Sequence, residues 1–405
     1  MAYRKDLKDS YSPLLFLASL GAGGAMVSMY MFLMFMVPHK GRPLAIYDDW
    51  LAAFSTGHVA YKIMIPIVLL GILVFAYIHV RTLIWNIVEY RKFRASVAYD
   101  GFVKSNNGIQ LMAIPLTLAM TMNGGFIAGA TFVPGLWSLS EYLLPAALVG
   151  FGIIGYFALK IFSNFMVNAL VHGHFDCERN NSLAQMLSVF SLAMVGVGFS
   201  AAAAMSHIKA TSAVGYIGAS FFFAAVIIFG TIKLVLGFRS MMSNGVNQET
   251  TPTLWIVIPI LTVLGIGLFR MTKGLEHNFG AHVEPASLFA LLTSLMAIQA
   301  VFGLIGYAIM KKVGYFERFV SGPDKSPGSL ALICPGIAAV VMANFFINWG
   351  LVGTEVVGKF SIAYFILYLP VIWLQIKTYL VMFKLLSKLL LEDKDAHIAG
   401  AASAS

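Results

Sequence analysis

Long apolar stretches alternate with short polar segments along the whole chain. Since about 20 apolar residues in a helix cross the hydrocarbon of a bilayer, this pattern gives ten candidate transmembrane spans. They cover residues 13–37, 60–85, 108–133, 139–165, 183–206, 212–238, 253–271, 287–311, 328–350 and 358–386. No polar segment is long enough for a soluble domain. The sequence therefore predicts an all-α polytopic membrane protein, with one transmembrane domain over residues 1–391 and a short cytoplasmic tail over 392–405.

Composition and charge agree with this prediction and add an orientation. Hydrophobic residues make up 59% of the 405 positions and charged residues 11%. Of the 27 Lys and Arg residues, 20 lie at the termini and around the loops after the second, fourth, sixth and eighth spans, and 7 on the other side. Because cytoplasmic loops are enriched in Lys and Arg, we expect both termini to be cytoplasmic, in the inner membrane. The basic excess has two readings, this topology and attraction for anions.

The even-numbered spans share an ending in which a basic residue follows an aromatic one by four positions. The pairs are Tyr77 and Arg81, Tyr156 and Lys160, Phe229 and Lys233, Tyr307 and Lys311, and Trp373 and Lys377. Anchoring at the membrane surface explains such pairs without a repeat. However, residues 150–160 and 301–311 match at six of eleven positions. We therefore expect five helical hairpins of similar length.

The odd-numbered spans differ from the even ones because they are rich in glycine, hydroxyl residues and proline. Pro115, Pro259 and Pro335 are expected to kink their helices in mid-membrane, which is tolerated where the freed backbone faces protein or a water-filled cavity. Small residues also permit close helix packing. The combination favours a central pore with the odd-numbered helices inside and bulky residues of the other five facing lipid.

Candidate pore-lining and gating residues are those around these expected kinks. They are Gly23, Pro115, Thr121, Phe126, Gly198, Phe199, Pro259, Thr262, Cys334, Pro335 and Phe345. No Asp or Glu falls in the middle of a span, which favours passive conduction over ion-coupled transport. No Lys or Arg is expected at mid-depth either. A permeating anion is therefore expected to be held by helix dipoles, hydroxyls and backbone N–H groups.

With ten spans, cytoplasmic termini, five hairpins, the segment TPTLWIVIP (251–259) and the turn CPG (334–336), the chain resembles the tellurite-resistance/dicarboxylate transporter (TDT) family. That family includes the TehA-like proteins and the plant slow-type anion channels, and its bacterial TsoY-like branch is a nearer candidate. The resemblance implies a homotrimer in which each subunit has its own pore, closed by a phenylalanine on the ninth helix.

The gating phenylalanine of the family has no counterpart at the matching position of this sequence. In the family the gating phenylalanine lies beside the ninth-helix proline, whereas here Cys334 precedes Pro335. Phe345 and Phe346 lie about three turns further on, and Phe126 and Phe199 are other candidate rings. A hydrophobic constriction closes a pore by dewetting without a specific contact.

Other chemistry in the sequence is weaker. His172, His174 and Cys177 share one polar loop, but their spacing matches no strong metal site, and a solvated loop is the simpler reading. His58, His79 and His207 are expected near span ends, without the paired helical arrangement that holds a haem. We expect no enzyme activity, no cofactor, small anions and lipid as partners, and no nucleic-acid binding. The alternatives are a membrane subunit of a haem or quinone oxidoreductase, and a proton-coupled exporter of organic anions, sulfite or tellurite.

Overall fold

The computed structural model describes residues 2–392, so residues 393–405 of the expected tail lie outside it. Within the described residues the chain is helical and has no β-strand. The α-helices are α1 (Phe16–Met36), α2 (Tyr47–Ser55), α3 (Val59–Arg94), α4 (Ala98–Val103), α5 (Ala113–Phe132), α6 (Ser140–Leu170), α7 (Leu187–Met205), α8 (Lys209–Asn244), α9 (Val257–Phe279), α10 (Pro285–Lys312), α11 (Ile333–Phe345) and α12 (Ile362–Leu390).

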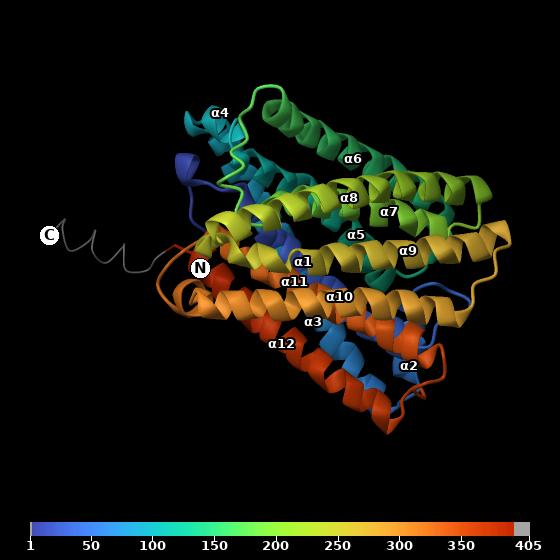
Figure 1. Cartoon of the computed structure of the whole chain (residues 1–405). Coiled ribbons are helices and arrows are strands. Elements are labelled where there is room, and N and C mark those ends of the chain that lie inside the picture. Colours follow the sequence, from blue (N-terminus) through green and yellow to red (C-terminus); the bar gives the residue numbers. More distant parts are fainter. Residues whose placement is uncertain (1, 393–405) are drawn as a thin grey trace.

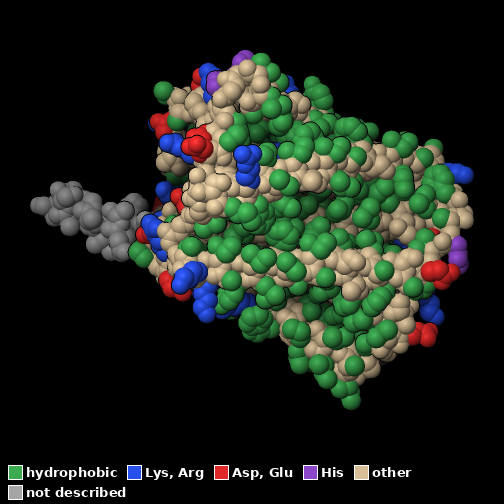
Figure 2. Space-filling model, in the orientation of Figure 1, with side chains coloured by type: hydrophobic (Ala, Val, Ile, Leu, Met, Phe, Trp, Pro, Cys, Tyr) green, Lys and Arg blue, Asp and Glu red, His purple; other side chains and the backbone are tan. Residues whose placement is uncertain are grey.

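Ten helical spans are long and apolar enough to cross a membrane, which confirms the predicted multi-pass membrane protein. The odd-numbered spans are 56 to 94% buried inside the protein and the even-numbered ones 22 to 33%, so the expected inner and outer sets are distinct. Hydrophobic side chains cover the sides of the outer helices, and most charged side chains gather at the two ends of the bundle (Figure 2). An apolar flank of this kind is what a bilayer requires.

The five inner helices contact one another in a closed sequence. Helix α1 contacts α5, α5 contacts α7, α7 contacts α9, α9 contacts α11, and α11 contacts α1 again. The long helices α3, α6, α8, α10 and α12 pack against this inner set, as α3 does on α1 and α8 on α7 (Figure 1). Glycines permit the closest approaches. At Gly198, for example, a Cβ would meet the Phe151 ring at 2.2 Å.

Each inner span begins with a 3₁₀ segment at the end of the bundle that carries the N-terminus, here called the proximal end (Figure 1, left). These segments are Pro13–Leu15, Asn106–Met112, Ala184–Met186, Gln248–Trp255 and Pro327–Leu332. The side-chain oxygen of a residue before each segment accepts a backbone N–H two positions on; these residues are Ser12, Ser105, Ser182, Asn247 and Ser326. Neighbouring segments also contact one another all the way round. The proximal end is therefore closed by a ring of five capped 3₁₀ segments, called below the 3₁₀ ring.

The proline prediction needs correction. Pro115, Pro259 and Pro335 each occupy the third position of an α-helix, directly after a 3₁₀ segment, rather than the middle of a bent helix. A proline in the first turn breaks no helical hydrogen bond, so these prolines mark the change from 3₁₀ to α geometry. Prolines inside α-helices occur in the outer set instead, at Pro66, Pro145 and Pro370, so kinks do not distinguish the inner helices.

The aromatic and basic pairs of the even-numbered spans divide into two kinds. Arg81, Lys160, Lys311 and Lys377 are exposed, as snorkelling side chains should be. Lys233 is 8% exposed: its ammonium lies 5.1 Å from the Phe162 ring centroid and donates to the Gln185 carbonyl at 3.3 Å. The five basic residues share the four-residue spacing from an aromatic residue but do not share one structural role.

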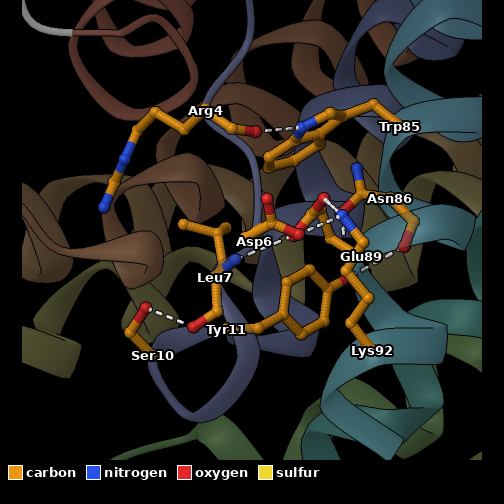
Figure 3. Close-up of polar contacts among 9 residues, drawn as sticks. All are labelled: Arg4, Asp6, Leu7, Ser10, Tyr11, Trp85, Asn86, Glu89 and Lys92. Atoms are coloured by element: carbon orange, nitrogen blue, oxygen red, sulfur yellow. Dashed lines mark hydrogen bonds and ion pairs between the residues drawn. The ribbon is translucent and has the colours of Figure 1, made fainter.

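The N-terminal segment lies against α3 at the proximal end (Figure 3). The Glu89 carboxylate, 1% exposed, accepts the Leu7 backbone N–H at 2.9 Å and the Lys92 ammonium at 2.7 Å. The Trp85 indole N–H donates to the Arg4 carbonyl at 2.7 Å, and the Arg4 N–H donates to Leu390 of α12 at 2.8 Å. The segment thus links the first outer helix to the last.

Candidate functional site

A cavity of about 890 Å³ lies among the inner helices. Helices α1, α5, α7, α9 and α11 all line it, and α6 adds a wall between α5 and α7. Its lining on α11 and the helical segment Phe346–Val352 that continues it runs from Cys334 to Val352, which at 1.5 Å per residue corresponds to about 27 Å. No described residue of the 3₁₀ ring lines it, so the cavity ends above the ring, whereas exposed residues such as Pro43 and His277 line its other end. We call that open end distal.

The distal opening is basic. Its lining includes four Arg or Lys residues, three histidines and, among the described residues, one carboxylate: Arg42, Arg270, Lys273, Lys359, His39, His207, His277 and Glu276. The Lys273 ammonium pairs with Glu276 at 2.7 Å, and Arg42 pairs with Asp49. Partial burial lowers the pKa of Lys359 from its ordinary value. Like charges gathered around a concave opening attract anions.

One face of α9 connects this opening with the depth of the cavity. Pro259, Thr262, Ile266, Arg270 and Lys273 line the cavity at spacings of three or four residues, and this periodicity continues to His277. Residues so spaced share one helix face. Arg270 is part of this face and lies well before the helix ends at Phe279, so one basic residue of the seventh span lines the cavity.

Aromatic rings cluster beside Arg270. The Phe345 ring meets Phe35 at 5.4 Å and Phe269 at 5.5 Å between centroids, in edge-on geometry. The Phe269 ring lies 5.1 Å from Trp349, and the Lys273 ammonium lies 5.4 Å from the Trp349 centroid. These separations are typical of favourable aromatic and cation–π contacts. Phe345 therefore belongs to a packed aromatic group near the distal opening.

The hydroxyls of the inner helices are mostly bonded to the protein. The Thr262 hydroxyl donates to the carbonyls of Ile258 (3.1 Å) and Ala338 (3.0 Å) and accepts from the Gln299 amide at 2.8 Å. Ser188 donates to the Gln185 carbonyl of the preceding 3₁₀ segment and Ser200 to the Val197 carbonyl of α7, each three residues earlier. In a membrane a hydroxyl proton needs an acceptor within the protein, and the nearest acceptor is a backbone carbonyl of the preceding helical turn. These groups are thus occupied and not directed at an anion.

The candidate pore residues divide into two groups. Phe126, Gly198, Pro259, Thr262, Cys334 and Phe345 line the cavity. The other five lie off its described lining: Gly23, Pro115, Thr121, Phe199 and Pro335. The Phe199 ring instead lies 5.7 Å from Phe222 of α8. Gly23 and Thr121 likewise contact His79 of α3, so these residues join neighbouring helices.

His79 is not at a span end as expected. It is 3% exposed within α3, and its Nδ1 lies 2.8 Å from the Ser19 carbonyl while its Nε2 lies 2.9 Å from the Thr121 hydroxyl. A Cβ at Gly23 would come within 2.9 Å of Nδ1. Both ring nitrogens are thus engaged in joining α3 to α1 and α5.

The loop after α6 contains no metal-binding group among the described residues. The His172 and His174 rings are 5.7 Å apart and Cys177 is exposed. Residues 2–392 include no cluster of three or more His, Cys, Asp or Glu side chains suited to a metal ion. At the distal opening, His207 Nδ1 and His277 Nε2 lie 2.7 Å apart, a pairing that the sequence did not suggest because the two residues are far apart in the chain.

Comparison with known proteins adds no family assignment. No family model, no curated protein and no solved structure matches this chain. Function is therefore inferred from the cavity and its lining.

Proposed function

We propose that this protein is a passive channel or facilitative transporter for small anions, with the cavity among α1, α5, α7, α9 and α11 as its conduction pathway. The observation that carries the proposal is the basic distal opening, where Arg42, Arg270, Lys273 and Lys359 face a single described carboxylate, Glu276. Such a potential raises the local concentration of anions and repels cations. The excess of Lys and Arg around the proximal loops supports a cytoplasmic proximal end and thus an inward-facing 3₁₀ ring.

The deeper lining supports movement of an anion without a coupled proton. On its described lining the cavity has no carboxylate proximal to Arg270, whereas proton-coupled carriers place an ionisable group near the substrate at depth. In this proposal the anion enters distally, passes Arg270 and the aromatic group, and leaves when the 3₁₀ ring opens. The resemblance to the TDT family adds the proposal of a homotrimer with one pathway per subunit.

Anion flux through liposomes containing the purified protein tests the proposal. Chloride, nitrate, sulfite and malate are compared under an imposed voltage with no proton gradient. Flux that follows voltage supports passive conduction. Flux that appears only with a proton gradient would support the coupled exporter instead, and no flux of any of these anions would count against conduction.

A further inference from the structure

Arg270 is a partly buried cation within the helical span Gln248–Phe279, without an anionic partner among residues 2–392. Its Nη1 donates to the Val197 carbonyl at 3.1 Å, and no described carboxylate lies within ion-pair distance of it. Lys273, one turn further along the same face, has Glu276. A guanidinium carries five N–H donors, and an unpaired charge within a span is costly. The cavity beside Arg270 is therefore a place where a bound anion would supply missing acceptors.

A second donor in the same cavity also lacks a partner. The Trp349 indole N–H is buried and has no acceptor among the described residues. Trp349 lines the cavity from the segment that follows α11, and its ring lies 5.1 Å from Phe269, the residue next to Arg270. A buried N–H without a partner costs free energy, and native proteins rarely leave one so. The Trp349 N–H without a partner and the Arg270 guanidinium without a carboxylate thus line the same cavity, where an anionic group would supply an acceptor.

The lining proximal to Arg270 is mostly apolar, with the Asn123 amide of α5 as a polar exception. Side chains of Met120, Met194, Val263, Ile337 and Val341 face the cavity there, and Thr262 has its hydroxyl occupied by protein. A bare inorganic ion would lose its hydration against these walls and gain little in return. An apolar group would gain by leaving water.

We propose that the cavity binds organic anions with one charged head and an apolar body. The head, a carboxylate or sulfonate, accepts hydrogen bonds from the Arg270 guanidinium and the Trp349 N–H, and the body lies along the apolar walls toward Cys334. An arginine fork suits a group with two oxygens better than a spherical halide. The volume of about 890 Å³ is within the range of pockets that enclose whole organic ligands, whereas one water occupies only about 30 Å³. This inference rests on the proposed function and names its substrate class.

Binding to the purified full-length protein tests the inference, with octanoate and benzoate as probes and acetate and nitrate as comparators. Calorimetry is expected to give octanoate an affinity at least about tenfold above acetate, because acetate has the same head without the body. Arg270→Gln is expected to weaken octanoate about tenfold to a hundredfold, the range typical for a hydrogen bond to a charged group. Trp349→Phe keeps an aromatic ring, although a smaller one, and removes the N–H, so a smaller loss is expected.

Matched variants separate the site from general charge and from misfolding. Lys62→Gln removes an exposed cation at the distal end of α3 that does not line the cavity, and it is expected to change octanoate affinity little. Val341→Asn makes the apolar wall polar and should weaken octanoate while leaving acetate unchanged. If Arg270→Gln does not fold, Arg270→Lys keeps the charge and loses the fork, and it should bind octanoate more weakly than the wild type does.

The inference is overturned if acetate or nitrate binds as tightly as octanoate, or if Arg270→Gln or its substitute Arg270→Lys binds octanoate with wild-type affinity. These results are distinguishable from failure of the proposed function. Chloride or nitrate flux without octanoate binding would refute the organic-anion site and leave passive conduction standing. Octanoate binding without flux of any anion would refute conduction and leave the site standing.

Discussion

The distal and proximal ends of the cavity differ in how their polar groups are satisfied. At the distal end Arg270 and the Trp349 N–H lack full partners among the described residues, and the side chains of Lys273 and Arg42 are about one-third exposed. At the proximal end a side-chain oxygen before each 3₁₀ segment accepts a backbone N–H, and Ser326 joins two segments by donating to Glu249 at 2.6 Å, although Gln185 Oε1 in the third segment has no partner. Polar groups without hydrogen-bond partners favour ligand binding, whereas polar groups bonded to one another stabilise a closed arrangement. We therefore assign recognition to the distal end and the barrier to the proximal end.

The largest expected effect comes from neutralising the distal end. Arg270→Gln should reduce voltage-driven nitrate flux by about tenfold or more, because the anion loses its buried cation. Lys359→Gln, which removes an exposed charge at the rim, should reduce flux by less. Flux measured in liposomes checks both variants, and equal flux in Arg270→Gln and wild-type protein would remove Arg270 from the pathway.

The proximal barrier can be weakened at the floor of the cavity. Phe190 is 5% exposed, lines the cavity, and lies in the first turn of α7 directly after the 3₁₀ segment. Phe190→Ala should lower the barrier to permeation and raise anion flux several-fold. For scale, a barrier lowered by about 1.4 kcal/mol makes the rate tenfold faster. The control is Phe223→Ala, a similarly buried ring that does not line the cavity. A rise of equal size in the control would indicate general loosening rather than an opened floor.

Removing one cap should destabilise the 3₁₀ ring. Ser326, 1% exposed, accepts the Gly328 N–H at 3.2 Å and donates to Glu249. Ser326→Ala is expected to lower the free energy of unfolding by about 1–2 kcal/mol. Ser361→Ala removes the cap of α12 at the distal end, where the Ser361 hydroxyl accepts the Tyr364 N–H at 3.2 Å, and should cost less. Denaturation of the purified protein in detergent measures both, and the reverse order would contradict the assigned roles of the two ends.

The smallest effect concerns pH and Lys359. Because burial lowers the pKa of its ammonium below the ordinary 10.5, the folded protein binds this proton less well than the unfolded chain. Burial of the charged ammonium lowers the free energy of unfolding while the group is protonated in both states. As the pH rises from the pKa of the folded state to that of the unfolded state, the folded protein loses this proton first, and the free energy of unfolding increases. Tm should therefore rise over that range in wild-type protein relative to Lys359→Gln. Parallel Tm curves for the two proteins would show that the Lys359 environment does not penalise its charge.

The ten spans and the buried character of the odd-numbered ones were predictable because lipid demands apolar flanks and satisfied backbones, which leaves a strong periodic record in the sequence. The location of the prolines was not, because the same residue marks a kink within a helix or a change from 3₁₀ to α geometry. Pro115, Pro259 and Pro335 were therefore assigned to the wrong feature.

Arg270 was missed for a different reason. Hydropathy ends the seventh span at residue 271, so Arg270 counted as a residue of the outer side, whereas α9 continues to Phe279. The three-and-four spacing from Pro259 to His277 is visible in the sequence and would have placed Arg270 on one face with Thr262. The bonding of the Thr262 hydroxyl to the protein was not predictable, because sequence does not tell whether a serine or threonine bonds its own helix or faces a cavity.

Sided labelling of Cys334 tests the central claim most directly, because this thiol lines the cavity near its proximal floor. Exposed Cys177, in the loop at the proximal end, reports which face a reagent reaches, and Val341→Cys gives a second thiol higher on the same wall. We predict that anionic sulfonatoethyl methanethiosulfonate, added distally to sealed vesicles, modifies Cys334 faster than cationic trimethylammonioethyl methanethiosulfonate does, and leaves Cys177 unmodified. Modification of Cys334 from the proximal face, or preference for the cationic reagent, would contradict an anion pathway open distally and closed by the 3₁₀ ring.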